Sequence, residues 1–341
     1  MIKIFLLLLL SNLLVLFNLK KFSRFINIYD KPNKKLKKHK SNVPLVGGII
    51  IIINIIIYSF LSLFFETPFK DIVVLNKEYI SVFFLATSFF LLGLYDDKFK
   101  LNPDRKFFLS IVFCIFALTL NKNLLIENVN LSFLGRNIIF NEFSFFFTLF
   151  CVIILINSLN FYDGINGQSL IFFIIVFGYL SIHSPLQLFY LILIFVCIFI
   201  LFLNLQNKIF LGDSGVYLLG SILAILLIYE YNIFKTIRFA DEIFLLLILP
   251  GLDLLRLTVM RIIKGKNAFY GDRNHIHHLL TNRFSLVFSN AILFLLSIFS
   301  ITLFKLLNLN FFITFFIFLI TYIFTIQFLK SNDKKYNYRK K

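Results

Sequence analysis

Apolar runs long enough to cross a lipid bilayer, separated by short polar segments, recur along almost the whole chain. A spanning helix needs about 20 predominantly apolar residues. Hydrophobic residues make up 59% of the sequence and charged residues only 15%, below the roughly 25% of an ordinary soluble domain. The polar gaps leave no room for a soluble domain of useful size. The sequence therefore predicts an all-α, polytopic integral membrane protein.

We expect about 11 transmembrane helices, whose ends the sequence defines to within roughly two to four residues. They cover residues 2–19, 45–65, 79–95, 107–121, 143–159, 169–183, 186–203, 214–229, 242–263, 286–305 and 308–329. No small-residue cleavage site follows the first run, so we expect a retained helix and not a signal peptide. Residues 1–330 would then form one transmembrane domain, and residues 331–341 a basic cytoplasmic tail that we expect to be disordered.

The distribution of Lys and Arg predicts the orientation of these helices in the membrane. When the segment after the first span is placed in the cytoplasm, most of the 34 basic residues fall on the cytoplasmic side. The N-terminus is therefore expected outside and the C-terminus inside. Topology accounts for the net charge of +17, so we expect no nucleic-acid partner. The same basic face would attract anionic lipid and nucleotide phosphates.

Five short polar motifs interrupt the apolar runs, and in this topology all of them lie on the cytoplasmic side. They are the basic stretch that ends in Gly47-Gly48, the pair Asp96-Asp97, the run Asn157–Gly167, the segment Gly212–Gly215 and the run Arg273–His278. Acidic, amide and imidazole side chains gathered at one membrane face suggest a metal-dependent phosphate site. The outer segments carry no comparable cluster, and we expect no chemistry there.

Two of these motifs are acidic. Asp96 and Asp97 end an apolar run, and adjacent carboxylates favour a nearby cation, either a divalent metal or a basic phosphate partner. The alternative is a solvated loop start, neutralised by Lys98 and Lys100. Asp213 stands among small residues at a helix start, which suits a metal-phosphate site or, equally, a helix N-cap.

The run Asn157–Gly167 is the strongest single signal in the chain. Asn157, Asn160 and Gly164 share one helical face, and polar side chains inside a span are costly unless they face a partner or a cavity. Amide oxygens can bind Mg²⁺ or recognise a sugar, and glycine allows close backbone approach. The alternative is hydrogen bonding between helices combined with a glycine-rich turn.

Three of the five histidines, His275, His277 and His278, fall within four positions, close to Arg273. Arg and His in proximity favour a diphosphate-binding loop over the alternatives of a zinc site or a solvated basic loop. Asp253 and Arg256 lie three residues apart within one apolar run. We interpret them as an internal ion pair.

Together these motifs resemble the polyprenyl-phosphate N-acetylhexosamine-1-phosphate transferases of glycosyltransferase family 4, over roughly residues 27–283. The stretch from Asp30-Lys31-Pro32-Asn33 to Gly47-Gly48 is most similar to the undecaprenyl-phosphate GlcNAc-1-phosphate transferase branch. Asp272-Arg273 followed by the three histidines is similar to the same branch. The eleven-span topology with the N-terminus outside agrees with that branch.

The resemblance implies an enzyme, a phosphotransferase for substituted phosphate groups, that uses a UDP-N-acetylhexosamine and a polyprenyl phosphate lipid. The lipid phosphate would displace UMP and form a polyprenyl-diphosphate sugar, which is the initiating step of a cell-envelope glycan. GlcNAc is the expected sugar, and Mg²⁺ is the implied cofactor, with Mn²⁺ as the alternative. The implied location is the bacterial inner membrane with the site on the cytoplasmic face, and a homodimer is left open.

By motif position, the resemblance assigns Asp213 and Asn160 to the metal and Asp96, Asp97 and Lys106 to catalysis. The implied substrate-binding residues are Asn157, Asp163, Asn166, Arg273, His275, His277, His278, Gly47 and Gly48. All of them are expected to converge on one cavity open to the cytosol, within a single catalytic domain of residues 1–330.

A secondary transporter or lipid flippase is the competing function. Such proteins place polar groups near the bilayer midplane, often in broken helices of related repeats. Here the polar motifs cluster at one face and no repeat is evident, which favours the transferase. A non-catalytic scaffold for envelope enzymes is a third, weaker alternative, because the metal-binding motif positions are intact.

Overall fold

The structure, a computed structural model, describes residues 2–32, 41–64, 76–265 and 274–338. Regular structure in these residues is almost entirely helical, with two small antiparallel sheets of two strands each. Six of the described helices are long and apolar enough to span a membrane, or eight spans result if each of two bent helix pairs is counted as one. The prediction of an all-α, multi-pass membrane protein is confirmed. The count of eleven spans and their orientation stay predictions.

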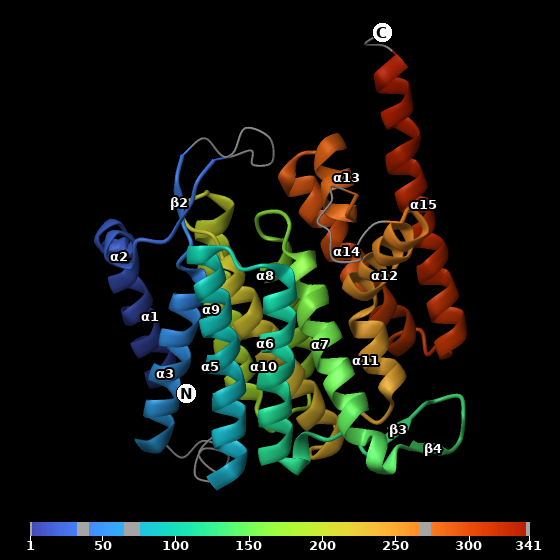
Figure 1. The fold of residues 1–341 in the computed structure, drawn as a ribbon, viewed down its shortest axis with the longest axis horizontal. Helices are drawn as coiled ribbons and strands as arrows, with labels where there is room; N and C mark the ends of the chain where they lie inside the picture. Colours follow the sequence, from blue (N-terminus) through green and yellow to red (C-terminus); the bar gives the residue numbers. More distant parts are fainter. Residues whose placement is uncertain (1, 33–40, 65–75, 266–273, 339–341) are drawn as a thin grey trace. The chain divides into compact units, whose positions relative to one another are not determined.

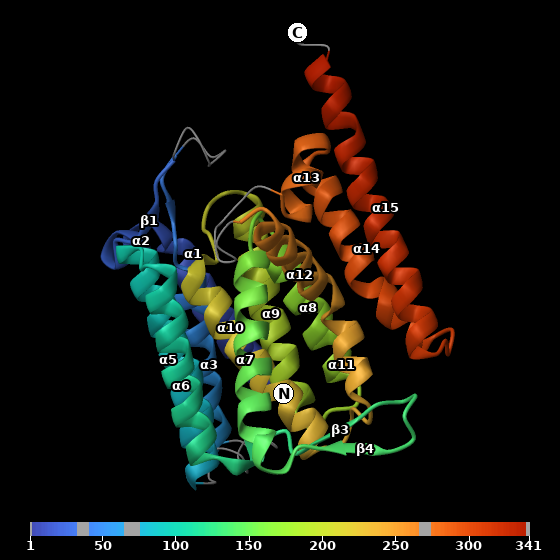
Figure 2. The ribbon, with the colours of Figure 1, turned by 45° about the vertical axis from the view of Figure 1, so that its right-hand side comes forward.

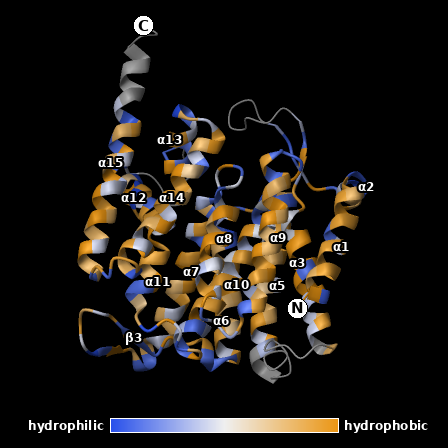
Figure 3. Ribbon diagram, turned by 180° about the vertical axis from the view of Figure 1, so that it is seen from behind, coloured by the Kyte–Doolittle hydropathy of each residue, from blue (hydrophilic) through white to orange (hydrophobic). Residues whose placement is uncertain are grey.

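The helices and strands are numbered along the chain (Figure 1). They are α1 (Ile2–Phe17), α2 (Leu19–Ile26), β1 (Tyr29–Asp30), β2 (Val43–Pro44), α3 (Gly47–Phe64), α5 (Asn76–Phe99), α6 (Pro103–Leu120), the 3₁₀ helix η1 (Lys122–Leu124), β3 (Asn128–Asn130), β4 (Asn137–Ile139), the 3₁₀ helix η2 (Asn141–Phe143), α7 (Ser144–Tyr162), α8 (Gln168–Ser181), α9 (Gln187–Leu205), α10 (Gly212–Asn232), α11 (Ala240–Leu246), α12 (Ile248–Ile263), α13 (Ile276–Arg283), α14 (Leu286–Lys305) and α15 (Phe311–Tyr338). Hydrophobic residues cover the middles of these helices, and hydrophilic residues gather at their ends and in the connecting segments (Figure 3).

Two of the expected spans are not single straight helices. The first is followed by α2, which bends by 78° from α1, and the run 242–263 is divided into α11 and α12 with a bend of 73°. The second break has a physical cause in Pro250, the third residue of α12. Proline has no N–H to donate, and its ring clashes with the carbonyl group four residues earlier. That residue is Leu246, where α11 ends.

The C-terminal tail is the second correction. Residues 331–341 were expected to be disordered, but α15 continues as one helix from Phe311 to Tyr338. Extending an existing helix adds one hydrogen bond per residue without a new nucleation cost, so a polar sequence can prolong an apolar helix.

The chain divides into two compact units, which are described separately. Unit 1 comprises Met1–Glu127, Phe140–Asn160 and Ser169–Thr236, and unit 2 comprises Asn128–Ile139, Phe161–Gln168 and Ile237–Lys341. The single catalytic domain of residues 1–330 stays a prediction.

Helix α10 is the centre of unit 1. Its spanning segment is 94% buried within the protein, and it packs against α5 and α3 (Figures 1 and 2). A helix that is apolar on all sides is stable only where neighbours surround it. Glycines permit the closest approaches, since a Cβ atom on Gly48 or Gly93 would lie 2.5 Å from backbone atoms near the start of α10.

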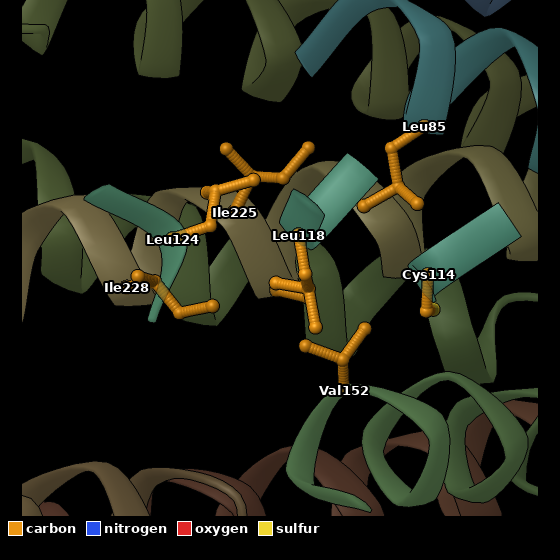
Figure 4. Close-up of a pocket in the computed structure, with 8 residues that line it drawn as sticks. Leu85, Cys114, Leu118, Leu124, Val152, Ile225 and Ile228 are labelled. Carbon is orange, nitrogen blue, oxygen red and sulfur yellow. The ribbon is translucent and has the colours of Figure 1, made fainter. Parts of the chain in front are cut away.

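The apolar core of unit 1 lies between α5, α6, α7 and α10. Its buried members include Leu85, Cys114, Val152 and Ile225. These side chains also line a small cavity, whose walls offer apolar groups and one buried thiol (Figure 4). Such a lining cannot bind phosphate or a cation, so we interpret the cavity as a packing gap.

Unit 2 is held together by α14, which packs against α11, α12, α13 and α15. At one end, Lys305 pairs with Glu242 at 2.6 Å, and Ser132 of the β3–β4 hairpin donates hydrogen bonds to Asp241. Toward the other end, the guanidinium of Arg283 lies 3.7 Å from the ring centre of Phe328 and donates to its carbonyl oxygen. Polar contacts as well as apolar packing thus hold the helices of unit 2 together.

Gly93→Ala tests the close packing of α5 on α10. The new methyl group would collide with backbone atoms of Asp213 and Ser214, so we expect the free energy of unfolding to fall by about 1–3 kcal/mol. The matched control is Gly178→Ala on α8, where a Cβ meets no atom within 4 Å and the change should stabilise the helix by about 0.5–1 kcal/mol. Thermal unfolding in detergent measures both, and equal effects would contradict the packing argument.

Candidate functional site

Three carboxylates from two helices meet in unit 1. Asp96 and Asp97 lie in the last turn of α5, and Asp213 is the second residue of α10. Gly212 turns the chain into α10 with a φ of +75°, where a Cβ atom would lie 2.6 Å from Oδ2 of Asp97. Only glycine combines this backbone conformation with such close packing.

Asp97 caps the start of α10 from the neighbouring helix. Its Oδ1 accepts a hydrogen bond from the backbone N–H of Asp213 at 2.9 Å, and its Oδ2 accepts from that of Ser214 at 3.0 Å. The first N–H groups of a helix have no partner within the helix, and a carboxylate there also compensates the helix dipole. The N-cap suggested for Asp213 is therefore supplied by Asp97, while the residue at the N-cap position, Leu211, makes no side-chain capping hydrogen bond.

Asp96 holds Lys106 beside Asp213. Its Oδ1 accepts from the backbone N–H of Leu101 at 2.6 Å, and its Oδ2 pairs with Nζ of Lys106. The same Nζ lies 3.4 Å from Oδ2 of Asp213. Of the nearby lysines, Lys106 of α6 is the one that pairs with Asp96, and the divalent metal expected beside the aspartates stays a prediction.

The three carboxylates differ in access to solvent. The side chain of Asp213 is 31% exposed, whereas that of Asp96 is 3% exposed and the whole Asp97 residue is 6% exposed. Burial by itself would lower the pKa of Lys106, but the carboxylates of Asp213 and Asp96 raise it above its ordinary value. Lys106 therefore stays charged, and it contacts two of the three carboxylates, those of Asp96 and Asp213. The open, oxygen-only donor set around Asp213 fits Mg²⁺ or Mn²⁺ better than Zn²⁺.

Gly47 and Gly48 lie against the same end of α10. Their N–H groups donate to the carbonyl oxygens of Phe210 and Leu211, each at 3.1 Å. A Cβ atom on Gly47 would lie 2.7 Å from Cα of Leu211. The close approach that these glycines permit is thus to the backbone before α10, and their substrate-binding role stays a prediction.

The polar run Asn157–Gly167 crosses from unit 1 into unit 2. Asn157 donates to the carbonyl oxygen of Ile153 in its own helix at 2.8 Å, and Asn160 is half-buried near the end of α7. In unit 2, Asp163 and Asn166 are half-buried, and the side-chain amide of Asn290 on α14 donates to the carbonyl oxygen of Asn166 at 2.8 Å. Asn290 had no sequence signal beyond being an amide inside an apolar run.

A second polar cluster lies within unit 2, around Asp253 of α12. Arg273 lies outside the described residues, but His275 precedes α13 and its Nδ1 lies 2.8 Å from Oδ2 of Asp253. The expected ion pair of Asp253 with Arg256 is present, with 2.7 Å between NH2 and Oδ1. Tyr322 of α15 donates to the same Oδ1 at 2.8 Å. The sequence predicted only the pair of Asp253 with Arg256, and nothing in it indicated Tyr322.

His277 is the most deeply enclosed residue of the histidine run. It is 1% exposed, its ring stacks on that of His275 at 5.2 Å, and His278 lies half-buried beside it. Burial lowers the pKa of His277 well below its usual 6.5, and the neighbouring His278 and His275 lower it further. Gly164 leaves the space that this ring occupies, since a Cβ atom there would collide with it.

The structure thus brings Asp96, Asp97, Lys106 and Asp213 together in one cluster of unit 1. It brings His275 and His277 together with Asp253 in unit 2. The convergence of both clusters on one cavity stays a prediction, as do the chemical roles assigned to the individual residues.

Comparison with known proteins links the first cluster to one family. The family described as glycosyl transferase family 4 matches residues 79–230, the segment that contains the three aspartates and Lys106. An undecaprenyl-phosphate alpha-N-acetylglucosaminyl 1-phosphate transferase of Escherichia coli O157:H7 is 27% identical over 283 residues, covering 78% of this chain and 72% of the relative. Proteins of the same name from Yersinia pestis and Thermotoga maritima are 28% and 27% identical, covering 80% and 77% of this chain and 74% and 76% of those proteins.

Matched Asp→Asn substitutions test the different roles of Asp97 and Asp213. In Asp97→Asn, the side-chain NH₂ group would face one of the two backbone N–H groups that the carboxylate binds in the wild type. That N–H group would lose its acceptor, so we expect the free energy of unfolding to fall by about 1–3 kcal/mol. Asp213→Asn removes a partly exposed carboxylate from a crowded acidic cluster and should leave the melting temperature unchanged or raise it. A larger loss for Asp213→Asn than for Asp97→Asn would contradict this division.

The buried neutral His277 predicts a pH-dependent stability. Below about pH 6.5 the unfolded chain binds a proton at this residue that the folded protein does not, so stability falls as the pH is lowered through this range. His277→Gln should therefore flatten the dependence of the melting temperature on pH between about 7.5 and 5. The matched control is His183→Gln, a substitution at an exposed histidine. An unchanged slope in His277→Gln would contradict the prediction.

Proposed function

This chain belongs to glycosyl transferase family 4, and from that premise we propose that it transfers N-acetylglucosamine 1-phosphate from UDP-GlcNAc to undecaprenyl phosphate. More broadly, it is an enzyme that transfers a sugar 1-phosphate to a polyprenyl phosphate. The products of the proposed reaction are the polyprenyl-diphosphate sugar and UMP. This reaction would begin the synthesis of a cell-envelope glycan.

The observation that carries the proposal is the acidic cluster of α5 and α10 with Lys106 at its centre. An oxygen of the lipid phosphate would attack the phosphorus that carries the sugar. The anhydride bond from this phosphorus to UMP would break, and UMP would leave with the electron pair. One phosphoanhydride replaces another, so no ATP is needed. Catalysis then reduces to positioning the two phosphates and neutralising their charge.

Different side chains would position the phosphates and neutralise their charge. We propose that Asp213, whose carboxylate is the most accessible of the three, holds Mg²⁺ together with Asn160, with Mn²⁺ as the alternative metal. A bound divalent ion would neutralise negative charge on the diphosphate oxygens. Lys106, which is held by Asp96, would contact a phosphate oxygen, and Asp97 would keep the start of α10 in place. We propose that a carboxylate oxygen of Asp96 or Asp213 accepts the proton of a protonated lipid phosphate.

The proposal puts the reaction at the cytoplasmic face of the bacterial inner membrane, where UDP-sugars are available. The distribution of Lys and Arg supports this orientation, with eleven spans and the N-terminus outside. The sugar and diphosphate contacts are proposed for Asn157, Asp163, Asn166, Arg273, His275, His277 and His278, and for the Gly47-Gly48 pair.

The direct test is purified protein in detergent with undecaprenyl phosphate and a panel of UDP-sugars, scored for UMP. We expect UMP release with UDP-GlcNAc that stops when EDTA removes divalent ions and returns with Mg²⁺ or Mn²⁺. Asp213→Asn should lower turnover by at least about 10²–10³-fold while the protein stays folded. A fully active Asp213→Asn variant would refute the metal assignment. Solute flux into vesicles that lack any nucleotide sugar would support a transporter instead.

A further inference from the structure

We propose that Asp253 is a positioning residue for the histidine motif: it fixes the proton of His275 on Nδ1 and, through the stacked rings, the placement of His277. The proposal rests on the proposed function, in which the histidines contact the sugar diphosphate. Asp253 itself has no role in that function as described above. We infer the positioning role of Asp253 from its place in the middle of a polar network.

Asp253 joins three helices of unit 2. It is 1% exposed, and its Oδ1 accepts from Arg256 of α12 at 2.7 Å, from Tyr322 of α15 at 2.8 Å and from the backbone N–H of Ile276 in α13 at 3.2 Å. Its Oδ2 lies 2.8 Å from Nδ1 of His275. A buried carboxylate is stable only when it is fully hydrogen-bonded, and here two of the four contacts, with His275 and with Ile276, fix the start of α13.

The neighbours of His275 determine which ring nitrogen carries the proton. Nδ1 faces a carboxylate oxygen, which only accepts, so Nδ1 is the donor. Nε2 faces NH2 of Arg261 at 3.4 Å, and a guanidinium group only donates. The ring therefore has its proton on Nδ1 and a lone pair on Nε2. A carboxylate commonly selects a histidine tautomer in this way.

The ring of His275 then places that of His277. His275 lies between Phe161, at 6.2 Å and 14° between ring planes, and His277, at 5.2 Å and 10°. Within the described part of the chain, Nδ1 of the buried His277 has no hydrogen-bond partner. Buried polar atoms are nearly always satisfied, so this nitrogen is the group that we expect to meet a ligand.

A metal site is the competing interpretation of the same residues. Asp253, His275 and His277 each offer a ligand atom within 4.8 Å of the others, a donor set that zinc can use. However, both oxygens of Asp253 already accept hydrogen bonds, and the guanidinium groups of Arg256 and Arg261 face the cluster. A cation would have to displace or repel these groups. The charges favour an anionic ligand such as a sugar diphosphate.

Histidine tautomers provide a test that does not depend on activity. We would label the full-length protein with ¹⁵N-histidine and record two-bond ¹H–¹⁵N correlations in detergent, since the chain has only five histidines to assign. The wild type should show His275 with its proton on Nδ1. In Asp253→Asn the side-chain NH₂ can face Nδ1, so the proton should move to Nε2 or become distributed between both nitrogens.

The matched control is Asp241→Asn. Asp241 is equally buried at 1% exposure, belongs to the same bent helix pair and accepts hydrogen bonds from Ser132. It should lose a similar amount of stability and leave the His275 signals unchanged. Asp253→Asn should in addition lower kcat/KM for the UDP-sugar by about 10–100-fold relative to Asp241→Asn, the range expected for losing a group that orients a contact residue.

Three outcomes would overturn the proposal. They are an unchanged His275 tautomer in Asp253→Asn, a kcat/KM equal to that of Asp241→Asn, and stoichiometric zinc in the wild type that is lost in Asp253→Asn. Absence of UMP release from every UDP-sugar by the wild type would instead refute the proposed function. The tautomer measurement would still decide whether Asp253 positions His275.

Discussion

The acidic cluster depends on the contact between the end of α5 and the start of α10. Glycines at positions 93 and 212 let the two backbones approach closely, and both oxygens of Asp97 accept N–H groups of α10. Without this contact, Asp213 would not lie next to Lys106 and Asp96. A backbone contact of this kind is rigid, because moving either helix would leave buried N–H groups without acceptors.

The three aspartates of the cluster are chemically identical but have different environments. Both oxygens of Asp97 accept N–H groups at the start of α10, Asp96 pairs with Lys106, and the side chain of Asp213 stays 31% exposed. Lys106 contacts two of these carboxylates, Asp96 and Asp213, and the proposed metal would add a second positive charge beside Asp213. In the proposed function, this cation would be held by protein and substrate together.

In unit 2, polar residues inside apolar helices connect helices that are distant in sequence. Asp253 and Tyr322 lie in runs that otherwise consist mainly of hydrophobic residues, and they meet Arg256 and His275 in one network. Burying these groups is costly, and each is compensated by a hydrogen bond with another. The network makes the start of α13 dependent on two other helices. The histidine motif at the start of α13 therefore depends on those helices as well.

Hydropathy and short motifs were sufficient to predict the all-α membrane class and the similarity to glycosyl transferase family 4, and they singled out the aspartates and histidines of both polar clusters but not Tyr322. These properties are local, because a run of apolar residues or a DD pair can be recognised without knowing what surrounds it. The tertiary structure alone decided that Asp97 caps α10, that Lys106 rather than Lys98 pairs with Asp96, and that Asp253 joins three helices. Each of these depends on which atoms face one another between helices distant in sequence, and a carboxylate that caps a helix has the same letter in the sequence as one that faces solvent.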